Sequence, residues 1–257
     1  MSISVIMSVF NEVNFIDKSI NSILKQSHHD FEFLIIDDFS NDGTLEKLKF
    51  YQSKDSRIKL FFNTERKGLS KNLNFLIKKS KYEYLARADA DDIYDCKRLE
   101  LQKNFLDNNK EIEMLGTDAF EIDDKSNVIG LIEKSKYNKK IKEIIYLQNP
   151  LIHSSVMMRK TKLSSEEYFF YNVKYERIQD YELWIRKFNK TNIYSLEKKL
   201  THYRNKNKNN IKMIFKDMFY GNKVRLKNIN DCKKLLLSLI IFNLHKIKTI
   251  IKSLFFR

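Results

Sequence analysis

Three carboxylates stand within four positions of one another in this chain, at Asp89, Asp91 and Asp92. They directly follow residues 84–88, an apolar run that predicts a buried strand. If that strand continued, alternation would point Asp89 and Asp91 to the same face. Carboxylates this close repel one another unless a cation lies among them, and oxygen ligands favour Mg²⁺ or Mn²⁺ over Zn²⁺. The cluster therefore predicts a divalent-cation site, with a solvated acidic turn as the alternative.

A second acidic pair, Asp37 and Asp38, follows the apolar run at residues 31–36 and precedes a turn that ends at Gly43. In open parallel sheets, ligands bind at the carboxyl ends of the strands. An aspartate there can accept hydrogen bonds from a nucleotide base or a ribose hydroxyl. Asp and Asn also stabilise turns and helix starts. We predict nucleotide contact for Asp38 and a turn role for Asp42.

The residues around these positions alternate short apolar runs with stretches of helical spacing. Strands are predicted at residues 2–10, 31–36, 59–62 and 84–88, with helices at 15–25, from 44 onward and at 69–79. Strands that alternate with helices indicate βαβ units and a mostly parallel sheet covered on both faces. Further along, helices are predicted at 98–106 and 180–188, and strands at 113–122, 128–132 and 154–158. The predicted fold class is α/β.

The composition predicts a globular protein with a sizeable core, because 42% of the 257 residues are hydrophobic and 13% are aromatic. A net charge of +15 favours polyanionic partners, which include nucleotides, nucleic acid and anionic membranes. A nucleic-acid reader would cluster arginines and aromatics, whereas lysines here are spread along the chain. We therefore expect no nucleic-acid partner.

The compartment is predicted from the two cysteines and from the first residues. Cys96 and Cys232 form no disulfide framework, so a reducing compartment is expected. The first residues read as a strand rather than a signal peptide, and the chain contains no apolar run of about 20 residues that would span a bilayer. These features predict a cytoplasmic protein.

Six motifs, in order, resemble the family 2 glycosyltransferases. They occupy residues 4–12, 36–44, 68–74, 86–92, 149–157 and 179–184, within a similarity that covers roughly residues 1–204. The resemblance implies a GT-A fold and an inverting transfer of a sugar from a nucleotide-diphospho-sugar, which we expect to be a UDP-sugar, to an acceptor hydroxyl. It also implies a Mn²⁺ or Mg²⁺ cofactor. A divalent ion on the diphosphate would neutralise charge that develops as the sugar–phosphate bond breaks.

The resemblance also assigns roles to individual residues. Asp180 aligns with the catalytic base, which takes the proton from the acceptor hydroxyl. Asp89 and Asp91 align with the metal-and-diphosphate motif. The sugar or acceptor side is expected to hold Asp92, Gln179 and Trp184. The nucleotide-sugar side is expected to hold Ser8, Asn11, Glu12, Asp38, Lys67, Gly68, Asn72, Arg87, Asp89, Ala90, His153 and Arg204.

Structural roles compete with some of these assignments. Asp180 begins a predicted helix and could serve as its N-cap, with Glu182 as the fallback base. His153 and Trp184 could be core residues. Arg87 could pair with the acidic turn instead of reaching a diphosphate, and either Arg204 or Lys206 could contact phosphate.

The C-terminal part is predicted to form two helices, at residues 211–228 and 233–256. The second has an apolar side and a basic side, which is typical of a helix adsorbed to an anionic membrane. Packing on the catalytic domain or on a second subunit is the alternative. We predict a catalytic domain at residues 1–210, divided near residue 95 into nucleotide-sugar and acceptor halves, and a basic amphipathic extension at 211–257.

Membrane attachment would suit an acceptor that is a glycan on a lipid carrier. We therefore expect a peripheral protein on the inner face of the cytoplasmic membrane that serves bacterial capsule, lipopolysaccharide or lipooligosaccharide synthesis. A dehydrogenase would need a glycine-rich turn after the first strand, and residues 10–13 lack it. A glycosidase would use two carboxylates without a nucleotide site. The alternative that remains is a non-catalytic protein that binds nucleotide-sugars or polyanions.

Overall fold

A computed structural model describes residues 3–160, 170–188, 192–205 and 211–255. Its centre is one mixed sheet with the strand order β3-β2-β1-β4-β8-β6-β9-β5, and β7 pairs with β6. The strands are β1 (Ile3–Val9), β2 (Phe31–Asp37), β3 (Ile58–Phe62), β4 (Tyr84–Ala88), β5 (Ile93–Tyr94), β6 (Ile112–Ile122), β7 (Val128–Ile132), β8 (Met157–Arg159) and β9 (Asn192–Arg204). The α/β prediction is confirmed.

The first four strands place the expected nucleotide-side residues along one edge. β3, β2, β1 and β4 are mutually parallel, so their carboxyl ends lie together. Strand order reverses at β1, because β2 and β3 lie on one side of it and β4 on the other. Such a reversal leaves a crevice beyond the strand ends where ligands bind. Asn11, Asp38 and Asp89 follow the three strands that meet at this point.

Helices cover both faces of this part of the sheet, which explains why its strands read as nearly continuous apolar runs. All seven residues of β2 are buried. Side chains from one face pack with α1 (Ile16–Leu24), α2 (Thr44–Lys54) and α4 (Arg98–Asn108), while those from the other pack with α3 (Leu69–Lys79) and α6 (Gln179–Lys187). Leu73, Leu76 and Ile77 are the buried apolar residues of α3.

Two predictions in the second half differ from the structure. The strand predicted at 154–158 begins later, because His153–Ser155 forms a short 3₁₀ turn before β8. Strand β9 was not predicted: its lysines and histidine hide the alternation, yet it pairs in parallel with β6 through several register shifts.

In the first half, the chain turns after Ala88, so Asp89 and Asp91 do not alternate along a continued strand.

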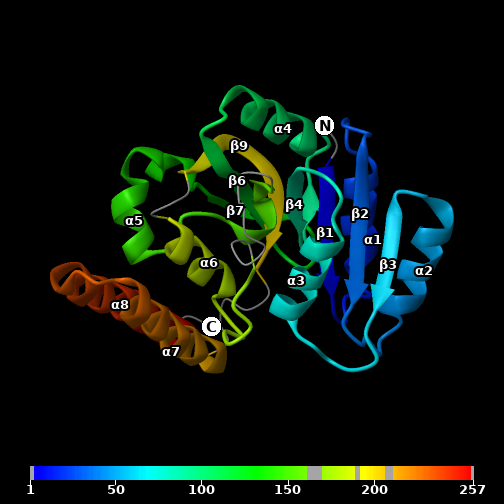
Figure 1. The fold of residues 1–257 in the computed structure, drawn as a ribbon. Coiled ribbons are helices and arrows are strands. Elements are labelled where there is room, and N and C mark those ends of the chain that lie inside the picture. The colour runs from blue at the N-terminus through cyan, green and yellow to red at the C-terminus, as the bar shows by residue number, and fades with distance from the viewer. Residues whose placement is uncertain (1–2, 161–169, 189–191, 206–210, 256–257) are drawn as a thin grey trace.

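The C-terminal residues form a pair of helices, α7 (Ile211–Asn228) and α8 (Cys232–Phe255), beside α5 (Ile141–Leu147) and α6. Figure 1 shows the pair at the end of the molecule away from β1, β2 and β3. A Cβ on Gly221 would overlap the ring of Phe242, so a larger residue at this position of α7 would force that ring of α8 to shift. Within the described residues, no helix is long and apolar enough to span a membrane.

Candidate active site

Asp38 organises the turn that leads into α3. The side chain is 2% exposed, and its Oδ1 accepts hydrogen bonds from Asn63 Nδ2 at 2.9 Å and the Lys67 amide at 2.8 Å. Its Oδ2 accepts one from the Gly68 amide at 3.0 Å. Burial alone would raise the pKa of Asp38, but these hydrogen bonds hold it below its ordinary value. The carboxylate is thus ionised, and both of its oxygens already accept hydrogen bonds from the protein. A nucleotide that contacts Asp38, as predicted, would have to share these oxygens with the protein donors.

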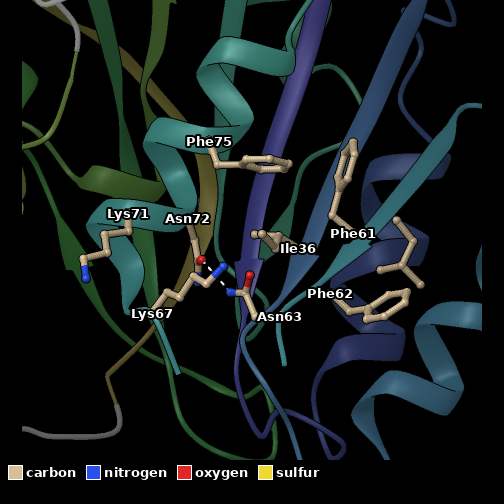
Figure 2. Close-up of a pocket in the computed structure, with 9 residues that line it drawn as sticks. Ile36, Phe61, Phe62, Asn63, Lys67, Lys71, Asn72 and Phe75 are labelled. Atoms are coloured by element: carbon tan, nitrogen blue, oxygen red, sulfur yellow. Dashed lines mark hydrogen bonds between the residues drawn. The ribbon is translucent and has the colours of Figure 1, made fainter. Parts of the chain in front are cut away.

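Asn63 extends this network to the first strand. Asn63 Nδ2 also donates to Asn72 Oδ1 at 2.8 Å, and Asn72 Nδ2 donates to Ser8 Oγ at 3.1 Å. Figure 2 shows Asn63 and Asn72 facing each other beside a cavity of about 360 Å³. The ring of Phe75 from α3 meets Phe61 of β3 edge-on, with centroids 5.1 Å apart. Ser8 and Asn72 are therefore brought together as expected. Asn63 was not among the residues predicted from the sequence, although it directly follows β3, at the edge of the sheet where ligands bind.

The loops after β1 and β2 are joined by hydrogen bonds. Asn11 has a positive φ of 53°; its amide donates to Ser40 Oγ, and its side chain exchanges two 3.0 Å bonds with Asn41. The Glu12 amide donates to Thr44 Oγ1 at 2.9 Å. Asp42 accepts from the Thr44 amide at 3.0 Å, which agrees with its predicted turn role. These contacts fix the outline of the crevice.

An unpredicted cation, Arg66, reaches this crevice. Its guanidinium lies 3.5 Å from the centroid of the Phe10 ring, just after β1, and 3.8 Å from Asp38 Oδ2. The Arg66 side chain is 57% exposed, so it could meet an anionic ligand. Its place in the polar stretch between β3 and α3 gave no periodic signal that would have singled it out.

The acidic turn after β4 is supported by buried arginines. Arg87 is fully buried and forms an ion pair with Asp89 Oδ1, which is the structural alternative that the sequence left open. Arg98 is also fully buried, and its Nη2 donates to the Arg87 carbonyl at 2.8 Å. Ala90 is 4% exposed and packs in the core beneath the turn. Asp89 and Asp91 remain partly exposed.

Asp92 and Arg204 point inward. Asp92 is 1% exposed, and its Oδ1 accepts a 2.8 Å bond from the Arg204 amide. Burial, followed by the charges of Asp89 and Asp91, raises the pKa of Asp92 well above its ordinary value. The Arg204 guanidinium is buried and bonded to the Asp91 carbonyl and to Ser126 Oγ. Arg204 therefore ties loops together and is not open to a phosphate, and Lys206 lies outside the described residues.

The acidic turn fits a divalent cation that is shared with a ligand. Among the described residues, no group of three or more His, Cys, Asp or Glu side chains is arranged to hold a metal alone. Mg²⁺ commonly takes one or two carboxylates and completes its shell with water and phosphate oxygens. Asp89 and Asp91 supply two such carboxylates, and within the described residues the buried Asp92 Oδ2 lacks a hydrogen-bond partner. This concentration of negative charge suits a cation at the turn.

A second cavity, of about 540 Å³, brings together residues from distant parts of the sequence. Asp89, His153, Gln179 and Asp180 all line it. Gln179 is 8% exposed, and its Oε1 has no hydrogen-bond partner within the described part of the chain. Other lining residues were not predicted: Leu69, Ile132, Lys134, Asn149, Leu151, Ile152, Glu176, Arg177, Ile178 and Tyr203. The predicted metal ligand, Asp89, and the predicted base, Asp180, therefore line the same cavity.

Asp180 is oriented by Asn149, whose Nδ2 donates to Asp180 Oδ2 at 2.5 Å. Asn149 was not predicted, but the proline that follows it is a signal that could have singled it out, because proline restricts the backbone of the residue before it. Asp180 is not the N-cap of α6; that place belongs to Ile178, whose φ is 60°. Glu182 is fully buried and bonds to Arg186 at 2.8 Å and 3.1 Å, so Asp180 is the better placed carboxylate.

Trp184 belongs to the core. It has no exposed surface, and its ring centroid lies 6.2 Å from that of His153. A sugar therefore cannot stack on Trp184 in this structure, and the core alternative for this residue is the one observed. Its bulk instead supports the imidazole at the cavity wall.

His153 is held neutral. Its Nε2 lies 2.8 Å from the Tyr171 hydroxyl. Burial, followed by the positive charge of Arg87, lowers the pKa of His153 to about 4. The ring therefore stays uncharged at neutral pH and can act as a polar wall of the cavity.

This low pKa predicts a specific pH dependence of stability. Because the unfolded chain binds the proton near pH 6.5 and the folded one only near 4, stability is lost as pH falls through that window. Between pH 7 and 5 we expect the free energy of unfolding to fall by about 1–2 kcal/mol from this residue. Urea unfolding of wild type and His153→Gln at both pH values measures the difference. Equal losses in the two proteins would contradict the prediction.

Comparison with known proteins shows the family to which the chain belongs. The sequence model described as Glycosyl transferase family 2 matches residues 4–168. WbnJ, an O-antigen biosynthesis glycosyltransferase of Escherichia coli, is 34% identical over 213 residues, which cover 80% of this chain and 80% of that protein. An uncharacterized glycosyltransferase of Methanocaldococcus jannaschii is 33% identical over 224 residues, 85% of this chain and 76% of the relative.

Two solved structures share the architecture. Residues 1–349 of S. aureus TarS, in complex with UDP-GlcNAc, match with a TM-score of 0.72 at 19% identity, over 100% of this chain and 76% of that one. The mannosyltransferase PcManGT of Pyrobaculum calidifontis, in complex with GDP-Man and Mn²⁺, matches with a TM-score of 0.70 at 14% identity, over 98% and 72%. The expected GT-A fold is confirmed.

Proposed function

Because the chain belongs to glycosyl transferase family 2, we propose that it is a metal-dependent, inverting enzyme that moves a hexose from a UDP-sugar to an acceptor hydroxyl. The observation that carries this proposal is the 540 Å³ cavity that Asp89 and Asp180 both line. A donor diphosphate at Asp89 and an acceptor hydroxyl at Asp180 would share one space. That is the arrangement a direct displacement at the anomeric carbon needs.

The roles of the side chains follow from their positions. Asp180 takes the proton of the attacking hydroxyl, while the hydrogen bond from Asn149 fixes the orientation of the carboxylate. Asp89 and Asp91 would hold the cation, which neutralises charge on the departing diphosphate. Gln179 lines the same cavity, and we assign its side-chain amide to a hydroxyl of the sugar. Attack from the side opposite the diphosphate inverts the anomeric centre.

The nucleotide would occupy the crevice after β1 and β2. Asn63, Asn72 and Lys67 offer polar groups beside an apolar cavity there, a combination that suits a base and ribose. We favour UDP because the TarS structures contain UDP or UDP-GlcNAc. PcManGT, with GDP-Man and Mn²⁺, supports a nucleotide-sugar and a divalent metal in general. The O-antigen role of WbnJ supports an acceptor in bacterial surface polysaccharide or lipopolysaccharide synthesis.

The direct test is donor hydrolysis across a panel of UDP-, GDP- and dTDP-sugars, with Mn²⁺, Mg²⁺ or EDTA. We expect one UDP-sugar to be hydrolysed and EDTA to stop the reaction. The alternative, a non-catalytic protein that binds nucleotide-sugars or polyanions, predicts binding without turnover of any donor. Turnover that persists unchanged in EDTA would refute the metal requirement but not the proposed sugar transfer.

The outer face of α8 supports peripheral attachment to the cytoplasmic face of an anionic membrane. Its exposed large apolar residues are Leu236, Leu237, Ile240, Ile241, Leu244, Ile247 and Ile251. Lys233, Lys234 and Lys248 are exposed on the same helix and would meet lipid headgroups. The opposite side of α8 packs on α7 and α5, so the helix has both a protein-facing and a free side.

We therefore expect the protein to sediment with vesicles that contain phosphatidylglycerol, and less so at high salt. Leu244→Glu should weaken this binding roughly tenfold, because an exposed apolar contact is lost and a like charge is added. Phe50→Glu, a matched change at an exposed aromatic residue on α2, should bind like wild type. If Leu244→Glu bound vesicles as well as wild type does, α8 would not be the attachment site.

A further inference from the structure

A cavity of about 550 Å³ lies where α5 and α6 meet the α7–α8 pair. It shares a wall with the Asp89 cavity, because Asn149, Arg177, Ile178 and Asp180 line both. Asp180 can thus be reached from the metal side and from the C-terminal helices. The family match ends at residue 168, so this second approach to the base depends on helices outside the matched segment.

The polar part of this cavity is built around Asp217. Its Oδ1 forms an ion pair with Arg177, and its Oδ2 lies 3.3 Å from Lys246 Nζ. Asp217 is 19% exposed and therefore still open to the cavity. Arg177 and Lys246 bring two positive charges, which Asp217 and the Asp180 of the shared wall offset, so this part of the cavity offers hydrogen-bond donors and acceptors that suit sugar hydroxyls.

The rest of the wall is apolar and leads outward. Ile144 and Leu147 of α5 and Ile241 and Phe242 of α8 all line the cavity. Ile241 is also 38% exposed and belongs to the outer apolar face of α8. The apolar lining is therefore continuous with the surface that we assign to the membrane.

This wall is built rigidly. Arg225 is 1% exposed, and its guanidinium lies 3.9 Å from the centroid of the Phe242 ring. Arg225 also donates to the Leu147 carbonyl at 3.0 Å and to Ser238 Oγ at 2.9 Å. One buried arginine thus ties α5, α7 and α8 together and holds Phe242 and Leu147, which both line the cavity.

We propose that this cavity is the subsite for an amphipathic acceptor, a glycoside whose sugar lies between Asp180 and Asp217 and whose apolar chain passes Ile241 towards the membrane surface. The proposal rests on the proposed function, since Asp180 must be the base that the acceptor hydroxyl meets. It assigns acceptor recognition to the C-terminal helices, and in particular to Asp217 and Ile241.

The test uses octyl β-glycosides of the common hexoses as probes, with the matching methyl glycosides for comparison. Affinity is measured by calorimetry and by saturation-transfer NMR below the micelle concentration. The full-length variants are Asp217→Asn, which removes the charge between the two cations, and Ile241→Trp, which narrows the apolar passage. Asp231→Asn is the matched control, because the Asp231 side chain is 51% exposed and its carboxylate is bonded to Lys234, outside the cavity lining. Thermal unfolding confirms that each variant is folded.

We expect an octyl glycoside to bind wild type and Asp231→Asn alike, and roughly tenfold more weakly to Asp217→Asn and Ile241→Trp. The methyl glycoside should bind far more weakly than the octyl one. Adsorption to the outer face of α8 would not respond to Asp217→Asn, so unchanged affinity in that variant overturns the proposal. Binding by no octyl glycoside, or equal binding of methyl and octyl forms, also overturns it. Donor hydrolysis by Asp231→Asn should match that of wild type; absence of donor hydrolysis in wild type would refute the proposed function instead.

Discussion

Replacing Asp180 by Asn should abolish sugar transfer while the donor still binds. Asparagine keeps the shape of the side chain and can still accept the hydrogen bond from Asn149 Nδ2, so the cavity wall should stay in place. It cannot take a proton from the acceptor hydroxyl. Loss of a general base costs about 10²–10⁴-fold in rate. Transfer of a radiolabelled sugar measures the loss, and calorimetry with the donor should show an affinity within about twofold of wild type.

The matched control for Asp180→Asn is Glu46→Gln, a charge removal on the exposed side of α2 that should leave transfer unchanged. Glu182→Gln tests the other carboxylate of α6 and distinguishes its role from that of Asp180. Because Glu182 is buried against Arg186, its change should lower stability rather than remove proton transfer. Transfer by Asp180→Asn at the wild-type rate would reassign the base.

Asp91→Ala should remove the stimulation of donor turnover by Mn²⁺. The cation is expected to gain its protein ligands from the turn after β4, where Asp91 is partly exposed and Asp89 is already paired with Arg87. A metal that stabilises charge on a leaving diphosphate contributes several kcal/mol, so loss of a ligand should cost on the order of a hundredfold in rate at low Mn²⁺. Higher Mn²⁺ should restore part of the activity if the site is weakened and not destroyed.

The measurement for Asp91→Ala is a Mn²⁺ titration of donor hydrolysis, together with the thermal shift produced by UDP with and without Mn²⁺. Asp124→Ala, at an exposed position of the β6–β7 turn, is the control and should titrate like wild type. A wild-type Mn²⁺ curve for Asp91→Ala would show that the cation, if one acts, does not depend on this carboxylate.

The amino-acid sequence was most informative where local pattern and burial agree. In residues 3–88, α3 and β4 begin and end where they were predicted, because apolar spacing reports which face of a helix or strand meets the core. It failed at β9, where lysines and a histidine interrupt the alternation and pairing with β6 decides the strand. It left open whether the strand continued past Ala88 or turned, because three aspartates carry no periodicity.

By itself, the sequence determined the α/β class, the order of the six motifs and the carboxylates able to do the chemistry. Only the tertiary structure decided which of those side chains meet. It placed Asp89 and Asp180 on one cavity, and it turned Arg204 and Trp184 inward. It also gave α8 one side for the protein and another for solvent. The physical reason is that periodicity records burial along a single element, whereas hydrogen-bond partners and shared cavities depend on contacts between elements far apart in the chain.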